Sequence, residues 1–138
     1  MEKSFDTEQL IDELKKDLAK RGFTLVFSEE CLLALEQRYT SDFENKVLDY
    51  QYFRKYHLNI LAFIGELHIK THGGKWMLEK SDRDGKDYPI AIKCKNGKES
   101  SDFIPVLNDI LAEELPLTGL VTLTASYYRI NLDCKRKW

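Results

Sequence analysis

Residues 50–76 read YQYFRKYHLNILAFIGELHIKTHGGKW and combine a long apolar helical pattern with a strong stop signal. At about 100° per residue, apolar side chains cover most of the surface of such a helix. The residues on its most apolar side include Ile60, Leu61, Ile64 and Leu67. The remaining polar strip consists of Lys55, Asn59, Glu66 and Lys70. A helix that is apolar nearly all round is normally buried against several elements, so we predict a buried central helix over residues 50–72.

The residues after this helix predict an antiparallel hairpin. Gly73 supplies the conformational freedom that ends a helix, and Gly74 lets the chain reverse so that Trp76 begins a strand. The segments KWMLE (75–79) and YPIAIKC (88–94) alternate apolar and polar residues and flank the polar turn SDRDGKD (81–87). Pro89 cannot donate to a ladder, so the second strand should begin there or lie at an edge. Asn96-Gly97 marks another tight turn.

Amphipathic patterns before and after this core predict further helices. One covers residues 8–21 with Thr7 as its cap, and another covers residues 29–39 with Ser28 as its cap. Between them, FTLVF (23–27) is either a short strand or an extended crossing segment. The segment Thr40 to Asp42 offers a separate helix start that leads toward the central helix. A further helix should run from Ser101 to Glu114.

The last apolar segment, residues 117–132, fits two structures. Val121, Leu123, Ala125 and Tyr127 alternate with small hydroxyl residues as in a strand, whereas Leu120, Leu123, Tyr127 and Ile130 fit a helix. With either outcome the whole chain, 1–138, is predicted to be a single α+β domain. It should be mainly helical, with a long buried central helix packed on a small antiparallel hairpin.

The composition of the chain argues against several kinds of partner. The chain has 138 residues and a net charge of −2, which gives no general attraction to nucleic acid or anionic lipid. It has no apolar run of about 18 residues, and its acidic start lacks the layout of a secretion signal, so we expect a cytoplasmic protein with no membrane partner. Three widely spaced cysteines, Cys31, Cys94 and Cys134, are expected to be free thiols, and no cofactor is expected.

His68 and His72 form the sharpest candidate for chemistry. Histidines at i and i+4 on a helix project from one face, which is the spacing of two zinc ligands. His57 lies about 16 Å away along the helix axis and cannot share their metal. Cys94 or Asp102 could approach in space, but the zinc-protease pattern is absent because Ile69 follows the first histidine. Histidines that serve the helix end are the favoured interpretation.

Glu66 follows Gly65 inside the apolar stretch. It could be a general base with a raised pKa, and a small metal-dependent enzyme using His68, His72 and Glu66 is therefore the alternative function. The favoured interpretation is structural: Glu66 would pair with Lys70, a backbone amide or a tyrosine hydroxyl. Gly65 then indicates that another element approaches the helix closely.

Charged surfaces suggest where a partner could bind. The partner-binding candidates lie in the turn 81–87 and in the helix 101–114; they are Asp82, Asp84, Asp87, Asp102, Asp109, Glu113 and Glu114. Two basic aromatic segments, the C-terminal YRINLDCKRKW (128–138) and YQYFRKYH (50–57), could instead contact nucleic acid by stacking and phosphate pairing. The acidic balance elsewhere argues against nucleic acid, which ranks third among the functions.

The run AFIGELHIKTHGGKW (62–76), followed by a hairpin, YPIAIK and an amphipathic helix, resembles small bacterial domains of unknown function. Several of those domains look like immunity or regulatory proteins of bacterial competition systems. The resemblance covers residues 50–130 and implies a helix where SYYRI (126–130) stands, although this chain has a longer, more acidic helix at 101–114. It supplies no catalytic residue. The function expected is non-enzymatic binding of another protein, such as a toxin, by an immunity-type or regulatory domain.

Overall fold

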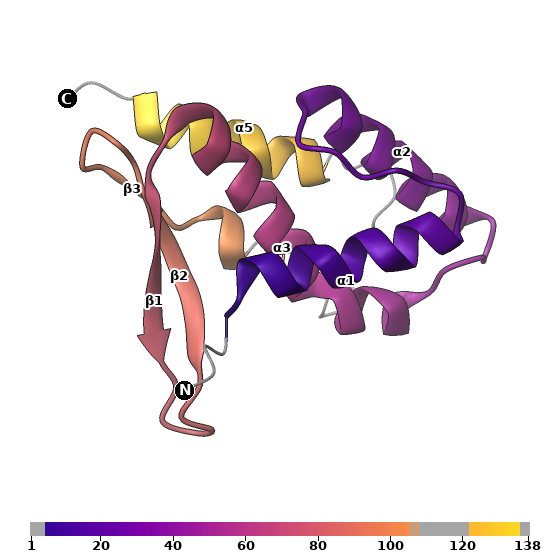
Figure 1. Ribbon diagram of the computed structural model, residues 1–138, viewed down its shortest axis with the longest axis horizontal. Coiled ribbons are helices and arrows are strands. Elements are labelled where there is room, and N and C mark those ends of the chain that lie inside the picture. The colour runs from indigo at the N-terminus through magenta and orange to yellow at the C-terminus, as the bar shows by residue number, and fades with distance from the viewer. Residues whose placement is uncertain (1–4, 106, 108–121, 136–138) are drawn as a thin grey trace.

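The computed structural model describes residues 5–105, 107 and 122–135. Figure 1 shows a group of helices with a small sheet along one side. The elements are α1 (Thr7–Lys20), α2 (Glu29–Glu44), α3 (Tyr50–His72), β1 (Lys75–Lys80), β2 (Asp87–Lys93), β3 (Glu99–Ser100) and α5 (Thr122–Lys135). The predicted α+β class is confirmed, because the chain is mostly helical with one antiparallel three-stranded sheet.

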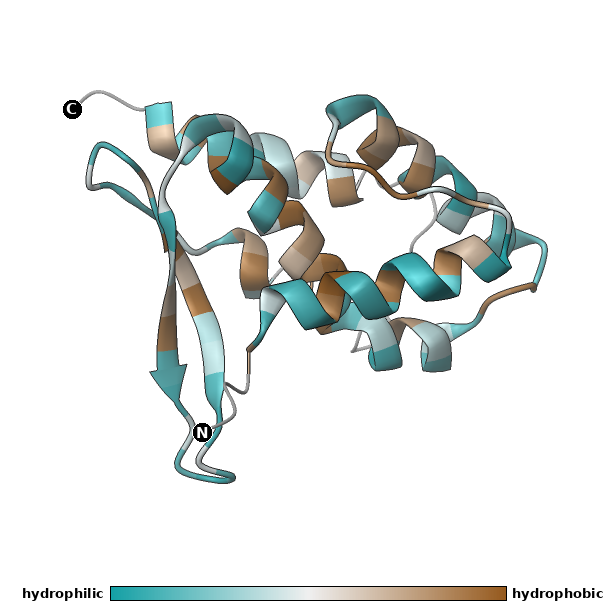
Figure 2. Ribbon diagram, viewed as in Figure 1, coloured by the Kyte–Doolittle hydropathy of each residue, from teal (hydrophilic) through white to brown (hydrophobic). Residues whose placement is uncertain are grey.

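Helix α3 is the centre of the core, as its sequence predicts. It contacts α1 and α5 (Figure 1). The sheet packs against α3 through Trp76, whose ring lies against Gly65. Hydropathy follows this arrangement, since apolar residues run along α3 while the β1–β2 turn is hydrophilic (Figure 2). One residue of the predicted polar strip is buried: the Asn59 side-chain amide donates to the Leu10 carbonyl of α1 at 2.8 Å. An amide can be buried there because α1 supplies its acceptor.

Helices α1, α2 and α3 each begin after a residue whose short side chain accepts hydrogen bonds from backbone amides of the first turn. Ser28 caps α2 as predicted, but the cap of α1 is Asp6 rather than Thr7, because the Asp6 carboxylate accepts from the Gln9 amide. Asp49 accepts from two amides in the first turn of α3, and Gly73 ends α3 with a positive φ of 84°. The separate helix start predicted at Thr40 to Asp42 is wrong, because α2 continues without a break to Glu44.

The segment 23–27 has no strand pairing and crosses the core as extended chain. Its Phe27 ring stacks on Phe63 of α3, with centroids 5.4 Å apart. The β-branched and aromatic residues that suggested a strand therefore serve side-chain packing, and the alternative of an extended crossing segment is the correct one.

The sheet has the order β1-β2-β3, and all neighbours are antiparallel. The predicted hairpin is confirmed, with Trp76 opposite Ile92 and Leu78 opposite Pro89. β2 is the central strand rather than an edge, which the proline did not predict. Pro89 is tolerated because the short β3 pairs only with Ile92 and Lys93, so no β3 residue lies opposite the proline.

The ambiguous C-terminal segment is a helix from Thr122, and residues 117–121 lie outside the described chain. Of the helix predicted from Ser101 to Glu114, the described part shows helical backbone at 103–105. The N-terminus of α5 is held by Glu36 of α2, whose carboxylate accepts from the Leu123 amide at 2.6 Å and the Thr124 amide at 3.2 Å. Among the described helices, none is long and apolar enough to cross a membrane.

Candidate functional site

The turn between β1 and β2 carries three of the predicted partner-binding carboxylates: Asp82, Asp84 and Asp87. In Figure 1 this hairpin extends away from the helices. The turn is closed by its own hydrogen bonds, from the Ser81 amide to the Lys86 carbonyl and from the Gly85 amide to the Ser81 carbonyl, both at 2.9 Å. The carboxylate of Asp84 accepts from the Lys86 amide and from the Tyr88 hydroxyl, and these bonds lower the pKa of Asp84. These contacts hold the backbone of the turn and the Asp84 side chain in one arrangement.

Two apolar residues next to this turn are exposed. Leu78 of β1 and Ile90 of β2 are each 40% exposed, and they lie at the register shift in which Met77 pairs with Ala91 and Leu78 with Pro89. β1 pairs only with β2 among the described strands, so its outer edge carries unpaired backbone groups. We refer to Leu78, Ile90 and the turn 81–87 together as the hairpin surface.

The other predicted carboxylates lie elsewhere. Asp102 follows β3, which pairs with the end of β2 opposite the turn, so Asp102 is remote from the hairpin surface. Its carboxylate forms an ion pair with Arg129 of α5 at 2.6 Å, which leaves little free charge for a partner. Asp109, Glu113 and Glu114 lie outside the described residues. Within the described residues, the structure therefore brings together the carboxylates of the turn and keeps Asp102 apart from them.

A second candidate, the His–Cys cluster, comprises His68, His72, Cys94 and Cys134. The two histidines come from the last turns of α3, Cys94 follows β2, and Cys134 lies in the last turn of α5. All four line an open pocket of about 300 Å³, which Lys95, Asn96, Asn131 and Lys135 complete. The imidazole rings have centroids 5.0 Å apart, as expected from the i,i+4 spacing.

The prediction of three free thiols is wrong for two of them. Cys94 and Cys134 form a disulfide, with Cα atoms 5.4 Å apart and 40 residues of separation in sequence. The fold brings the end of α5 beside the β2–β3 turn, which the sequence alone did not predict. Cys31 is free and buried, as expected. With the disulfide formed, no three His, Cys, Asp or Glu side chains in the described chain are arranged to hold a metal ion.

His68 is fixed from both sides of its ring. Its Nδ1 lies 2.6 Å from the Asn131 Oδ1, and its Nε2 lies 3.4 Å from the Cys134 Sγ. Since an amide oxygen only accepts, Nδ1 carries the proton and Nε2 directs its lone pair at the sulfur. His68 is 1% exposed, and burial lowers its pKa against the opposing effect of the Asn131 bond. The ring is therefore neutral, with a free nitrogen facing the cysteine pair.

Glu66 does not join the two histidines. Its carboxylate accepts from the Trp76 indole Nε1 at 3.0 Å and lines an open cleft of about 850 Å³ together with Asp12, Lys15 and Lys70. The favoured structural interpretation of Glu66 holds, although its partner is an indole rather than an amide or a tyrosine. A catalytic group built from Glu66 and the two histidines has no support in this arrangement.

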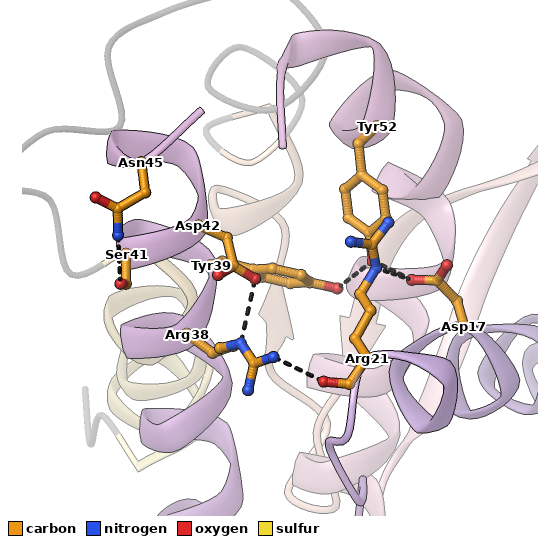
Figure 3. Close-up of polar contacts among 8 residues, drawn as sticks. All are labelled: Asp17, Arg21, Arg38, Tyr39, Ser41, Asp42, Asn45 and Tyr52. Carbon is orange, nitrogen blue, oxygen red and sulfur yellow. Dashed lines mark hydrogen bonds and ion pairs between the residues drawn. The ribbon is translucent and has the colours of Figure 1, made fainter. Parts of the chain in front are cut away.

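A network of polar side chains connects α1, α2 and α3 (Figure 3). The Tyr52 hydroxyl donates to Asp17 at 2.6 Å and lies 2.9 Å from the Tyr39 hydroxyl. Arg38 donates to the Arg21 carbonyl at 2.7 Å, and Arg21 pairs with Asp17 at 3.3 Å. Burial raises the pKa of Tyr39 and of Tyr52, so both hydroxyls stay protonated. Every group here has a partner within the network, which is typical of a structural contact between helices.

Comparisons of the chain with protein-family models, with curated proteins and with solved structures found no match.

Proposed function

We propose that this chain is a non-enzymatic protein-binding domain that engages another protein through the hairpin surface. The observation that carries the proposal is that one hairpin has both two exposed apolar side chains, Leu78 and Ile90, and a charged turn closed by its own hydrogen bonds. An apolar centre with a polar rim is the usual composition of a protein interface.

The turn contributes in two ways. Its internal hydrogen bonds fix the backbone before a partner arrives, which reduces the entropy lost on binding. Its three aspartates and two basic residues, Arg83 and Lys86, give residues 81–87 a net charge of −1. A weakly acidic rim favours a partner with a complementary basic patch and suppresses acidic ones.

The class of partner rests on the resemblance of residues 62–76 to domains of bacterial competition systems. We propose an immunity-type or regulatory role, in which the domain occludes the active surface of a toxin. A rigid hairpin that extends beyond the helices suits occlusion, because it can enter a concave surface without a change in the helical core (Figure 1).

Affinity capture from the native cells tests the proposal when it compares three forms of the chain. The double variant Leu78→Ser/Ile90→Ser should lose the partner that the wild type captures. A matched control, Val26→Ser/Leu33→Ser, replaces two residues of similar exposure in the 23–27 segment and in α2, and should capture the partner as the wild type does. For the purified partner we expect at least tenfold weaker binding by the hairpin variant, about 1.4 kcal/mol.

Two results would count against this function. Equal capture by both variants would show that the hairpin surface is not the interface, provided that circular dichroism shows both variants folded. Hydrolysis or modification of a small molecule by the isolated chain would contradict a non-enzymatic role.

A further inference from the structure

The His–Cys cluster collects two sulfurs and two imidazoles from three separate elements at one pocket. Sulfur and imidazole nitrogen are the ligands that Zn²⁺ prefers, and two cysteines with two histidines form one of its common structural sets. The hairpin surface lies at the other end of β2, so this cluster has no part in the proposed partner contact.

The distance between His68 and Cys134 matches that of two neighbouring zinc ligands. The His68 Nε2 lies 3.4 Å from the Cys134 Sγ. With Zn–N bonds of about 2.0–2.1 Å, Zn–S bonds of about 2.3 Å and a tetrahedral angle, nitrogen and sulfur ligands lie about 3.5 Å apart. The spacing of this nitrogen and this sulfur is therefore compatible with one shared metal ion.

Asn131 supplies the outer contact that zinc-bound histidines usually have. Its Oδ1 lies 2.6 Å from His68 Nδ1, which holds the ring orientation and leaves Nε2 free for a metal. Asn131 and Cys134 lie one helical turn apart on α5, so one helix provides both a ligand and the group that orients another. The second ring nitrogen of His68 faces the Cys134 sulfur, which becomes a thiol only when the disulfide is reduced.

The two cysteines stay close without the bond between their sulfurs. The Asn96 side chain donates to the Cys134 carbonyl, and the Ser100 hydroxyl donates to Asp133 at 2.8 Å, so the turn after β2 and β3 are both tied to the end of α5. Reduction would let the sulfurs separate to van der Waals contact. That separation is close to the spacing of about 3.8 Å between two thiolates on one tetrahedral zinc ion.

We propose that the reduced chain binds one Zn²⁺ through Cys94, Cys134 and His68, with His72 as the fourth ligand, and that oxidation of the cysteine pair releases the metal. His72 is half-buried, lines the same pocket, and has its ring centroid 5.0 Å from that of His68. Lys95 and Lys135 also line the pocket.

The exchange of metal for disulfide balances with a peroxide as oxidant. The two zinc-bound thiolates give up two electrons and form the S–S bond, and Zn²⁺ leaves. The O–O bond of hydrogen peroxide breaks, and its oxygens take the two electrons from the thiolates and two protons from the solvent to become two waters. A dithiol reductant reverses the step: it becomes a disulfide and returns two electrons and two protons, and Zn²⁺ then displaces the protons.

Metal titration of the full chain tests the inference. The protein is reduced with a phosphine under anaerobic conditions and titrated with Zn²⁺ against a chromophoric chelator. One zinc per reduced chain and none per oxidised chain are expected. Substitution with Co²⁺ should give the intense visible bands of a tetrahedral centre together with thiolate-to-cobalt charge transfer. Weak octahedral bands, or no stoichiometric metal in the reduced chain, would overturn the proposal.

Variants separate ligands from bystanders. His68→Ala and Cys94→Ser should each weaken zinc binding by more than the roughly 10–100-fold that loss of an outer contact causes, and Asn131→Ala should fall within that range. His57→Ala, on the same helix, should bind zinc as the wild type does, because His57 does not line the pocket and its Nδ1 lies 2.8 Å from the Arg54 carbonyl oxygen. An equal effect of His57→Ala and His68→Ala would refute the site. Zinc that stays bound when one equivalent of peroxide forms the disulfide would refute the release step.

Discussion

Gly65 fixes how closely the sheet approaches the central helix. A Cβ at this position would lie 2.1 Å from Cζ2 of Trp76 and 3.1 Å from Cδ1 of Ile92. The indole therefore occupies the space that any other residue would need. The same ring meets Phe5 edge-on, with centroids 4.9 Å apart, and donates to Glu66. One missing side chain on α3 thus allows Trp76 to join the helix, the sheet and the N-terminal segment.

Gly65→Ala should destabilise the protein even though alanine is the better helix former. The gain in helix propensity is about 1 kcal/mol, whereas overpacking in a core costs about 1–3 kcal/mol, and here the clash involves a large ring. We expect a net loss of about 1–2 kcal/mol in the free energy of unfolding, measured by urea denaturation. In a Trp76→Leu background the same substitution should be neutral or stabilising. An equal loss in both backgrounds would contradict the packing explanation.

Glu36 acts at the residue scale as a cap supplied by a different helix. Glu36→Ala would leave the Leu123 and Thr124 amides without their acceptor, at a cost of about 1–3 kcal/mol in the free energy of unfolding. Glu36→Gln keeps an oxygen acceptor and should cost much less. Glu30→Ala, an exposed change on the same helix, is the control and should stay within about 0.5 kcal/mol of the wild type.

Because Glu36 can be protonated, its contribution to the free energy of unfolding depends on pH. Burial raises the pKa of Glu36 in the folded chain above its ordinary value of 4.5, against the opposing hydrogen bonds from Thr124 and Leu123. The folded chain therefore binds the proton more tightly than the unfolded chain. This contribution to the free energy of unfolding is present below pH 4.5 and is lost as the pH rises through the folded-state pKa. Glu36→Gln should remove this decline, and an unchanged profile would exclude Glu36 as its source.

At the scale of elements, the disulfide ties α5 to the sheet across 40 residues. Removing a cross-link of this length costs roughly 2–4 kcal/mol in the free energy of unfolding, through the entropy regained by the unfolded chain. Reduction by a phosphine should therefore lower the urea midpoint. Zinc added to the reduced chain should raise the urea midpoint part of the way back, since binding to the folded state adds to stability. The double variant Cys94→Ser/Cys134→Ser should respond to neither reagent.

The sequence predicts correctly those elements whose pattern and end signals lie within the element itself. The bounds of α3 follow from its apolar pattern and from Gly73, and the hairpin follows from alternation around a polar turn. The end of α2 was misplaced because Thr40 to Asp42 resembles a cap, although the helix continues through it to Glu44. The strand alternation at 121–127 also misleads, since Leu123, Tyr127 and Ile130 pack as one face of α5.

The sites depended on contacts that no local pattern contains. The sequence shows that His68 and His72 have the spacing of two zinc ligands, and it offers Cys94 as a group that could approach them in space. The convergence with Cys134 required the docking of α5 against the β2–β3 turn, which is a long-range contact. No local signal marks Glu36 as a cap, because its acceptor role depends on the position of Leu123. Sequence reasoning finds candidate groups, and only the fold shows which of them meet.

At the scale of the whole molecule, the sheet separates two surfaces. The hairpin surface lies at the turn end of β2, and the His–Cys cluster lies at the other end, beside the termini of α3 and α5 (Figure 1). The helical core beside the sheet is held by buried apolar contacts and by the network of Figure 3. A partner on the hairpin should therefore leave the metal affinity of the reduced chain unchanged.

Hydrogen exchange of the chain, alone and in complex with the captured partner, tests the central claim most directly. Amides in β1, in the turn 81–87 and around Ile90 should become protected in the complex, while the amides of α2 and of residues 94–98 keep their free-state rates. The unpaired edge of β1 makes this difference large, because its amides exchange readily until a partner covers them. Protection confined to α1, α2 or the ends of α3 and α5, with the hairpin unchanged, would contradict the proposed interface.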